Sequence, residues 1–281
     1  MAAPTQSREA GKPDRTLKLY QVDAFTPALF EGNPAAVCPL REWLPDEVMQ
    51  NIAAENNLAE TAYFVETDEV PKYNLRWFTP TQEVDLCGHA TLASAHVLFH
   101  HLGVAEDQVE FSSKGGALTV KQGENGFLWM DFPALPVAPL ESTTETALLR
   151  EGLGVERFAG LYSSTYDYLV ELDGEDDVKG LNPDFAIIKK LKTRGVIVTA
   201  PGKKVDFVSR FFAPAAGIDE DPVTGSAHCV SAPFWGSKLN KTEVTAKQVS
   251  SRGGFIRCKI SKDRVLIGGQ AVTYMEGSIR Y

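Results

Sequence analysis

Two short glycine-containing segments, at residues 88–90 (Gly-His-Ala) and 225–227 (Gly-Ser-Ala), have the composition of helix starts that can bind an anion. The first N–H groups of a helix have no partner within the helix, and the helix dipole makes that end electropositive. A substrate carboxylate would fit such a start as well as a phosphate does. The alternative is that each glycine only relieves crowding where a strand meets a helix. Because the segment occurs twice, we favour two anion-binding turns facing one cleft.

Two side chains beside these turns could act on a substrate. His89 falls in the first turn of a helix, where the dipole disfavours an imidazolium, so we expect a neutral ring that donates or accepts a hydrogen bond. Asp221 lies on the approach to the second turn, and the Pro222 that follows it restricts the backbone. An ordinary acidic loop before a helix is the alternative, and we adopt it for the neighbouring Asp219 and Glu220.

Cys87 directly precedes the first turn, and a thiol at a helix N-terminus can have a lowered pKa. Racemases that remove a proton from an amino-acid carbon with two bases often use a pair of such cysteines. Here the position before Gly225 is Thr224, so the two-thiol mechanism is unavailable. We favour a buried, structural Cys87 over a nucleophile.

Other motifs of catalysis are absent or incomplete. His96 and His100 are four residues apart on an expected helix but lack the glutamate of the zinc-protease motif. Ser226 and His228 do not form the Gly-x-Ser-x-Gly elbow. No Gly-x-Gly-x-x-Gly follows a strand, and no phosphate-loop motif is present. We therefore expect neither a metal site nor a bound nucleotide.

The composition is that of a globular protein with a small-molecule ligand. Of 281 residues 43% are hydrophobic and 23% charged, which argues against wholesale disorder. The formal net charge of -9 excludes a broad phosphate-backbone-binding face, although a local pocket can still be positive. The four cysteines do not have the spacing of a disulfide scaffold, and no apolar run reaches the length of a membrane span. The polar N-terminus lacks the apolar core of a signal peptide, so we expect a disordered tail over residues 1–16 and a cytoplasmic protein.

The elements that position these residues follow from local patterns. Residues 17–22 alternate as a half-buried strand should, and a turn at 32–34 (Gly-Asn-Pro) precedes another strand. A helix is predicted from Pro45-Asp46 to the Asn56-Asn57 pair, with apolar residues at helical spacing. The next strand covers residues 60–65 and puts Glu60 at its start.

The two halves of the chain repeat one another. Residues 76–80 (RWFTP) resemble 210–214 (RFFAP), and an acidic loop follows each. Each glycine turn is followed by an apolar helical stretch, and residues 113–116 (SKGG) then match 251–254 (SRGG). Because several matches occur in the same order, the chain contains a duplicated unit. We expect a tail at 1–16, a half-domain at 17–133 and a second at 134–281, with the last strand a candidate to join the first half. The ligand cleft would lie between the two halves.

Five ordered segments resemble the phenazine-biosynthesis (PhzF-like) proteins, and the likeness runs from about Leu17 to the C-terminus. The segments are 32–37 (GNPAAV), 57–62 (NLAETA), 78–80 (FTP), 87–91 (CGHAT) and 221–228 (DPVTGSAH). The family is similar in fold to diaminopimelate epimerase. This resemblance implies an α+β fold of two similar, pseudo-twofold-related domains, each a β-barrel-like sheet wrapped around a central helix.

The resemblance also implies an activity. In the phenazine-pathway member a glutamate, here matched by Glu60, shuttles a proton, and a histidine, an aspartate and a serine surround the substrate. These match His89, Asp221 and Ser226. The family works without metal or organic cofactor and commonly forms homodimers. The local sequence at 85–90 (DLCGHA) departs from the phenazine enzymes, so the isomerase class is expected and the phenazine substrate is not.

We therefore expect a cofactor-independent isomerase that moves a proton within a small carboxylate-bearing substrate, without a nucleic-acid or membrane partner. An amino-acid racemase or epimerase is one alternative, and a non-catalytic binding protein on the same fold is another. The predicted catalytic residues are Glu60, His89 and Asp221, and the predicted substrate-binding residues are Gly88, Ala90, Gly225, Ser226 and Ala227.

Overall fold

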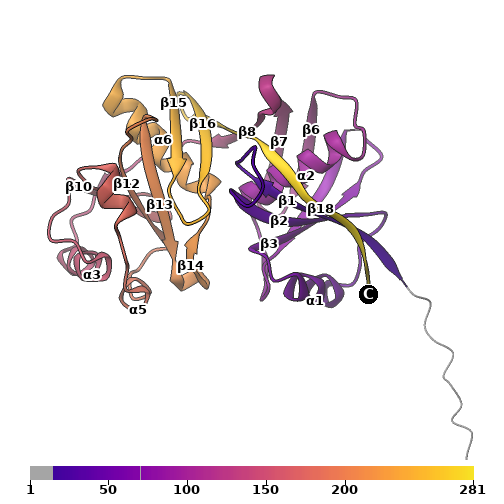
Figure 1. Ribbon diagram of the computed structural model, residues 1–281, viewed down its shortest axis with the longest axis horizontal. Coiled ribbons are helices and arrows are strands. Elements are labelled where there is room, and N and C mark those ends of the chain that lie inside the picture. Colours follow the sequence, from indigo (N-terminus) through magenta and orange to yellow (C-terminus); the bar gives the residue numbers. More distant parts are fainter. Residues whose placement is uncertain (1–14, 70) are drawn as a thin grey trace, which may run out of the picture.

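The computed structural model describes residues 15–69 and 71–281 and has a mixed α+β fold dominated by strands (Figure 1). This confirms the predicted class. The strands are β1 (Thr16–Ala24), β2 (Asn33–Leu40), β3 (Glu60–Glu66), β4 (Lys72–Phe78), β5 (Glu83–Val84), β6 (Gln108–Ser113), β7 (Gly116–Gln122), β8 (Leu128–Pro133), β9 (Ala138–Pro139), β10 (Gly160–Ser163), β11 (Asp167–Glu171), β12 (Gly195–Pro201), β13 (Phe207–Ala213), β14 (Ile218–Asp221), β15 (Glu243–Gln248), β16 (Gly254–Ser261), β17 (Arg264–Gly269) and β18 (Ala271–Arg280). The helices are α1 (Asp46–Asn56), α2 (Gly88–His100), α3 (Thr143–Leu153), α4 (Glu175–Lys179), α5 (Phe185–Ile188) and α6 (Gly225–Leu239), with short 3-10 turns η1 (Glu124–Gly126) and η2 (Pro214–Ala216).

Local signals placed the first elements well. Helix α1 begins after Pro45 and ends at Asn57, which adopts the left-handed conformation at φ 49 that terminates helices. Strand β3 begins at Glu60, as predicted. Residues 1–14 of the predicted tail lie outside the described residues. Strand β1 begins at Thr16, one residue earlier than predicted.

The strands of the first half pair in a fixed order. Strand β2 is parallel to β3, β3 is antiparallel to β4, and β4 pairs antiparallel with β5 and parallel with β6. Strand β6 then pairs antiparallel with β7. Helix α2 connects β5 to β6, because two parallel neighbours need a crossover connection.

The second half repeats this order of pairings. Strand β11 is parallel to β12, β12 is antiparallel to β13, and β13 pairs antiparallel with β14 and parallel with β15. Strand β15 pairs antiparallel with β16, and α6 is the crossover helix. The duplicated sequence segments therefore occupy corresponding places in the two sets of strands.

The repeat extends to side-chain contacts. Arg76 on β4 forms a two-pronged ion pair with Glu83, at 2.7 Å from Nε to Oε1 and 3.0 Å from Nη2 to Oε2. Arg210 on β13 forms the same pair with Glu220, at 2.7 and 2.8 Å. Parallel N–H donors of a guanidinium fit a carboxylate well, so each pair fixes the loop that leads to a glycine turn.

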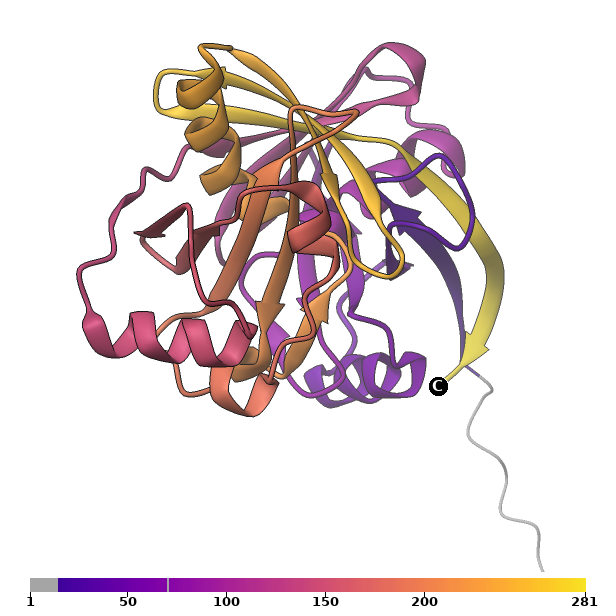
Figure 2. The same ribbon diagram turned by 60° about the vertical axis from the view of Figure 1, so that its left-hand side comes forward.

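Two pairings join the halves. Strand β8 pairs with β17, and the last strand, β18, leaves the second half to pair with β1 along its length. Figures 1 and 2 show β18 in yellow running beside the first strands of the chain. The C-terminal residues therefore complete the sheet around α2 and hold the two sets of strands together.

The two crossover helices form the centre of each half. In α2 every residue from His89 to Phe99 is buried, and α6 buries most of its first turns and Trp235. Both helices are buried over most of their length, as is expected of a helix that strands surround. Within residues 15–69 and 71–281, no helix is both long and apolar enough to cross a membrane. The buried helices bring their N-terminal ends to the middle of the molecule.

Candidate active site

The starts of α2 and α6 meet at their glycines. A methyl group added to Gly88 would lie 3.7 Å from the Cα of Gly225, and one added to Gly225 would lie 3.8 Å from the Cα of Gly88. Neither helix start has a side-chain hydrogen bond from its N-cap residue. Two electropositive helix ends at such a short separation repel each other, so an anion between them would be favourable.

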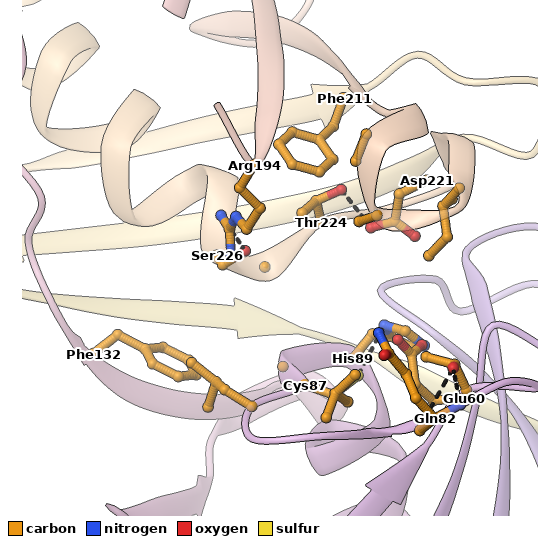
Figure 3. A pocket seen from close by; sticks show the side chains of 18 residues that line it. Glu60, Gln82, Cys87, His89, Phe132, Arg194, Phe211, Asp221, Thr224 and Ser226 are labelled. Carbon is orange, nitrogen blue, oxygen red and sulfur yellow. Dashed lines mark hydrogen bonds and ion pairs between the residues drawn. The ribbon is translucent and has the colours of Figure 1, made fainter. Parts of the chain in front are cut away.

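A cavity of about 180 Å³ opens at this junction (Figure 3). A cavity of this size suits a small ligand. Both halves contribute to the walls. The lining residues are Glu60, Thr79, Gln82, Val84, Leu86, Cys87, Gly88, His89, Phe132, Arg194, Phe211, Ala213, Ala216, Ile218, Asp221, Thr224, Gly225 and Ser226.

Six of the eight predicted site residues therefore meet in one cavity, although their positions span more than half of the sequence. The two exceptions are Ala90 and Ala227, which do not line it. Their side chains are 0% and 1% exposed and pack in the hydrophobic core. The third residue of each helix already faces the surrounding strands, so its methyl group serves packing.

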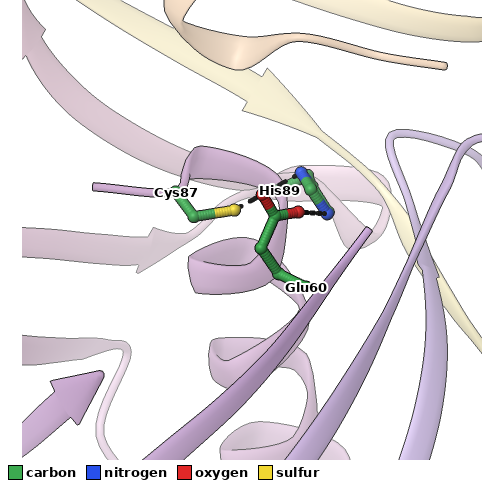
Figure 4. A group of neighbouring side chains, drawn as sticks. All are labelled: Glu60, Cys87 and His89. Carbon is green, nitrogen blue, oxygen red and sulfur yellow. Dashed lines mark hydrogen bonds and ion pairs between the residues drawn. The ribbon is translucent and has the colours of Figure 1, made fainter. Parts of the chain in front are cut away.

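Glu60 is positioned by the start of β3, where it lies opposite Ala35 of the parallel strand β2. The residue is 8% exposed. Its Oε2 atom lies 3.1 Å from Nε2 of His89, and neither atom has a hydrogen-bond partner beyond this ion-pair contact within the described residues (Figure 4). His89 thus orients one oxygen of the Glu60 carboxylate, and because the side chain lines the cavity, the carboxylate is placed to take a proton from a ligand.

The surroundings of His89 differ from those considered in the prediction. Burial lowers the pKa of His89, but its interactions with Cys87 and the Glu60 carboxylate outweigh this effect and raise the pKa well above its ordinary value. The expectation of a neutral ring considered only the helix dipole and not the carboxylate on the neighbouring strand. In either charge state, an Nε2–H group can donate to Glu60.

Cys87 is buried, and its Sγ lies 3.5 Å from Nδ1 of His89. Burial raises the pKa of its thiol to about 11, so the thiol is protonated at neutral pH. A protonated thiol is a poor nucleophile, which agrees with the structural role favoured from the sequence. One candidate atom each from Glu60, Cys87 and His89 lies within 4.8 Å of the others, a spacing that could hold a metal ion.

Asp221 faces these residues from the second half. Its Oδ1 accepts a hydrogen bond of 2.7 Å from the Asn33 amide, and its Oδ2 accepts one of 2.5 Å from the Thr224 hydroxyl. Burial raises the pKa of Asp221 to about 6, against the effect of His89, which lowers it. The carboxyl group therefore changes charge close to neutral pH.

Asn33 is a site residue that the sequence reasoning missed. Its Nδ2 lies 2.7 Å from Asp221 Oδ1 and 3.2 Å from Nδ1 of His89, so it links the two halves. Gly32 makes this placement possible: it has φ +68, and a Cβ there would lie 2.2 Å from the Ala24 carbonyl oxygen. The segment at 32–34 was interpreted as a turn and as part of a segment that resembles the family, and no local signal indicated a partner far along the chain.

The walls also contain Phe132, Phe211 and Arg194, which the sequence reasoning did not identify. Phe132 lies on β8, Phe211 lies on β13 within the repeated segment 210–214, and Arg194 directly precedes β12. The repeat indicated a duplication but no role at the site. The dismissed pair, His96 and His100, are in contact with ring centroids 4.5 Å apart and planes tilted by 45°, and they are not among the lining residues. Burial lowers the pKa of His96 to about 3, so its ring is neutral.

The sequence matches a family model. The model for the PhzC-PhzF family, described as phenazine biosynthesis-like protein, matches residues 22–277. An uncharacterized isomerase of Pseudomonas aeruginosa is 50% identical over 264 residues, which cover 94% of this chain and 98% of that protein.

Solved structures give the same likeness. The crystal structure of a phenazine biosynthesis protein of the PhzF family from Enterococcus faecalis has a TM-score of 0.89 and 46% identity, over 94% of this chain and 99% of that one. A hydroxyproline epimerase from Agrobacterium vitis has a TM-score of 0.58 at 10% identity, over 95% and 93% of the two chains. At that identity the second likeness concerns the fold alone.

Proposed function

The chain belongs to the phenazine biosynthesis-like (PhzC-PhzF) family and is an isomerase, and we propose that it moves a proton within a small carboxylate-bearing substrate with Glu60 as the acid/base group. The observation that carries this proposal is the Oε2 atom of Glu60. It is buried and lies in an ion-pair contact with His89 Nε2, and the Glu60 side chain to which it belongs lines the cavity.

The proposed reaction needs one proton carrier and leaves the composition of the substrate unchanged, and the carboxylic acid of Glu60 exchanges its proton with solvent before it returns one. The Glu60 carboxylate takes a proton from a carbon of the substrate, and the electron pair left behind delocalises toward an adjacent unsaturated or carboxylate group. The carboxylic acid of Glu60 then returns the proton to a different carbon on the same face. A positioned group of this kind contributes about 10²–10⁴ in rate.

Residues around Glu60 orient its carboxylate and the substrate. His89 lies in an ion-pair contact with Glu60 through Nε2 and orients the carboxylate that must act. Asp221, held by Asn33 and Thr224, accepts a hydrogen bond from a polar group of the substrate. The helix starts at Gly88 and Gly225 favour the substrate carboxylate and the negative charge that develops near it.

Amino-acid racemisation or epimerisation is the second candidate function, and the likeness in fold to a hydroxyproline epimerase favours it. That reaction needs a second proton donor on the opposite face of the substrate. The position equivalent to Cys87 is Thr224, which is a poor acid, so a proton shift on one face is the better supported reaction. A non-catalytic binding protein on the same fold is the third alternative.

One experiment separates the three. The protein is incubated in D₂O with a panel of small unsaturated, cyclic and amino acids, and each acid is analysed by mass spectrometry and NMR. A proton shift yields a constitutional isomer with deuterium on a new carbon, whereas epimerisation places deuterium on the same carbon with inverted configuration. Deuterium incorporation that is equal in the wild type and in Glu60→Gln would refute the proposed role of Glu60.

We also propose that the two halves, residues 17–133 and 134–281, are domains related by a pseudo-twofold axis, each a β-barrel-like sheet around α2 or α6. The shared order of strand pairings and the paired ion pairs of Arg76 and Arg210 support this. The proposal includes a homodimer in the cytoplasm that has neither nucleic acid nor a membrane as a partner. Light scattering after size-exclusion chromatography tests the dimer.

A further inference from the structure

Arg194 is the one arginine that lines the cavity, and no lysine lines it among the described residues. It directly precedes β12, and its side chain is 39% exposed. Figure 3 shows Arg194 and Ser226 toward the Phe132 end of the cavity, away from Glu60 and His89. The cavity therefore has a cationic end and a proton-handling end.

A buried carboxylate holds the guanidinium in place. Asp167, whose side chain is 0% exposed, accepts hydrogen bonds of 2.9 Å from Nε and 2.5 Å from Nη2 of Arg194. Nη2 also donates to Oγ of Ser226 at 3.2 Å, and the guanidinium lies 5.7 Å from the Phe211 ring centroid. Within residues 15–69 and 71–281, Nη1 donates no hydrogen bond, so its two N–H groups are available to a ligand.

The repeat gives this position a counterpart. Phe78 and Phe212 occupy the same position in the repeated segments 76–80 and 210–214. Thr61 pairs with Phe78, and Val196 pairs with Phe212. Thr61 therefore corresponds to Val196, and the preceding Glu60 corresponds to Gly195. Arg194 is one residue before that position. The second half thus presents a cation close to where the first half presents the acid/base carboxylate.

We propose that Arg194, oriented by Asp167 and assisted by the Ser226 hydroxyl, anchors the carboxylate of the substrate and makes the site selective for acids over neutral analogues. This inference rests on the proposed function and adds an orientation to it. The carboxylate is held at the Arg194 end, so the carbon that exchanges its proton lies toward Glu60. A fixed guanidinium suits this task because its planar donors match a carboxylate and remain charged at every physiological pH.

The test compares benzoate with benzamide, which have the same shape but differ in charge. Isothermal titration calorimetry on the full chain at low salt is expected to give at least about tenfold tighter binding of benzoate. Arg194→Lys keeps a charge but loses the planar fork, and should lose most of this preference. Ser226→Ala removes one donor and should weaken benzoate binding by about threefold.

Replacing Arg194 alone by a neutral residue would leave the buried Asp167 unpaired, so that variant could fail to fold. The double variant Arg194→Gln with Asp167→Asn removes both charges together and is expected to bind both ligands equally. Thermal melting by circular dichroism verifies that each variant is folded. Equal binding of the two ligands by the wild type, or a preference that persists in both arginine variants, would overturn the inference.

Failure of the inference and failure of the proposed function give different results. If the wild type shows no preference for benzoate but exchange in D₂O requires Glu60, the anchor is wrong and the isomerase chemistry stands. If benzoate binding depends on Arg194 but no acid exchanges a proton, the anchor stands and the proposed reaction is wrong.

Discussion

The two halves of the cavity have the same scaffold but different chemistry. Each half presents a helix that starts with glycine, and each helix has a serine that donates to a carbonyl one turn earlier, Ser94 to Ala90 at 2.8 Å and Ser231 to Ala227 at 2.9 Å. The first half adds Glu60 to this scaffold, and the second half adds Arg194. The duplicated backbone arrangement is thus the same in both halves. Because different side chains occupy it, proton transfer can be assigned to the first half and anion binding to the second.

The difference lies in a few corresponding positions. Glu60 corresponds to Gly195, Cys87 to Thr224, and His89 to Ser226. Glu60 and His89 of the first half lie close to the start of their own helix, whereas Asp221 accepts a hydrogen bond from Asn33 of the opposite half. Substitutions at these positions test whether the two halves have the different roles proposed for them.

The largest effect is expected for Glu60→Gln, which removes the proton acceptor from the first half. Solvent-deuterium incorporation into the substrate should fall by about 10²–10⁴ while benzoate still binds, because the amide is similar in size but cannot accept the proton. Glu66→Gln, at the exposed far end of the same strand, is the matched control and should leave the rate unchanged. A loss of less than about tenfold in Glu60→Gln would show that another group transfers the proton.

The next effect concerns Asp221, the acidic residue of the second half. Its pKa is raised from 3.8 to about 6, so the carboxylate needed to accept from the substrate is lost as the pH falls through about 6. The rate of deuterium incorporation should therefore rise with pH between 5 and 7. In Asp221→Asn the rate should be lower, by about tenfold or more, and this acidic limb should disappear. Persistence of the limb in the variant would assign it to another group.

The same shift predicts a change in stability of opposite sign. The folded protein binds the proton of Asp221 more tightly than the unfolded chain does. The stabilisation by this proton is complete below pH 4 and is lost as the pH rises through about 6, with a magnitude of about 3 kcal/mol. Urea unfolding of the wild type and of Asp221→Asn at pH 5 and 7.5 samples about half of this loss, so the wild type should lose about 1.4 kcal/mol more than the variant between these values.

Gly195 corresponds to Glu60, and a substitution there tests whether the second half has room for a side chain at this position. A Cβ at this position would lie 2.3 Å from Cζ of Phe211, so Gly195→Ala should reduce the free energy of unfolding by about 1–3 kcal/mol. Gly277→Ala on β18 is the control, because nothing lies within 4 Å of its added methyl group. Equal stability of the two variants would mean that Phe211 moves aside without cost.

The smallest activity change is expected for Cys87→Ala. The thiol is protonated and buried, so its removal should change the rate of deuterium incorporation by less than about threefold. A loss as large as that of Glu60→Gln would restore a thiol-based mechanism and favour racemisation. Elemental analysis is a companion measurement: we expect no stoichiometric metal, and about one zinc per chain would direct attention to Glu60, Cys87 and His89.

The sequence by itself determined the local elements and the duplication. The Asn57 stop of α1 and the start of β3 at Glu60 depend on neighbouring residues, so they could be read directly. The two glycine turns were recognised because they repeat in order with their flanking segments. The assignment of Glu60 as the acid/base residue, in contrast, depended on the resemblance to a family and not on spacing.

Only the tertiary structure decided which distant residues complete the site. Asn33 and Asp221 are 188 positions apart, and nothing in either local sequence indicates that one amide would bond the other's carboxylate. Arg194 lacks a motif and became visible only when the fold placed it on the cavity wall. The surroundings of His89 were missed for the same reason: a helix dipole follows from the local sequence, but the carboxylate 3.1 Å away comes from another strand. Electrostatic interactions depend on distance in space, and that distance is fixed only by packing.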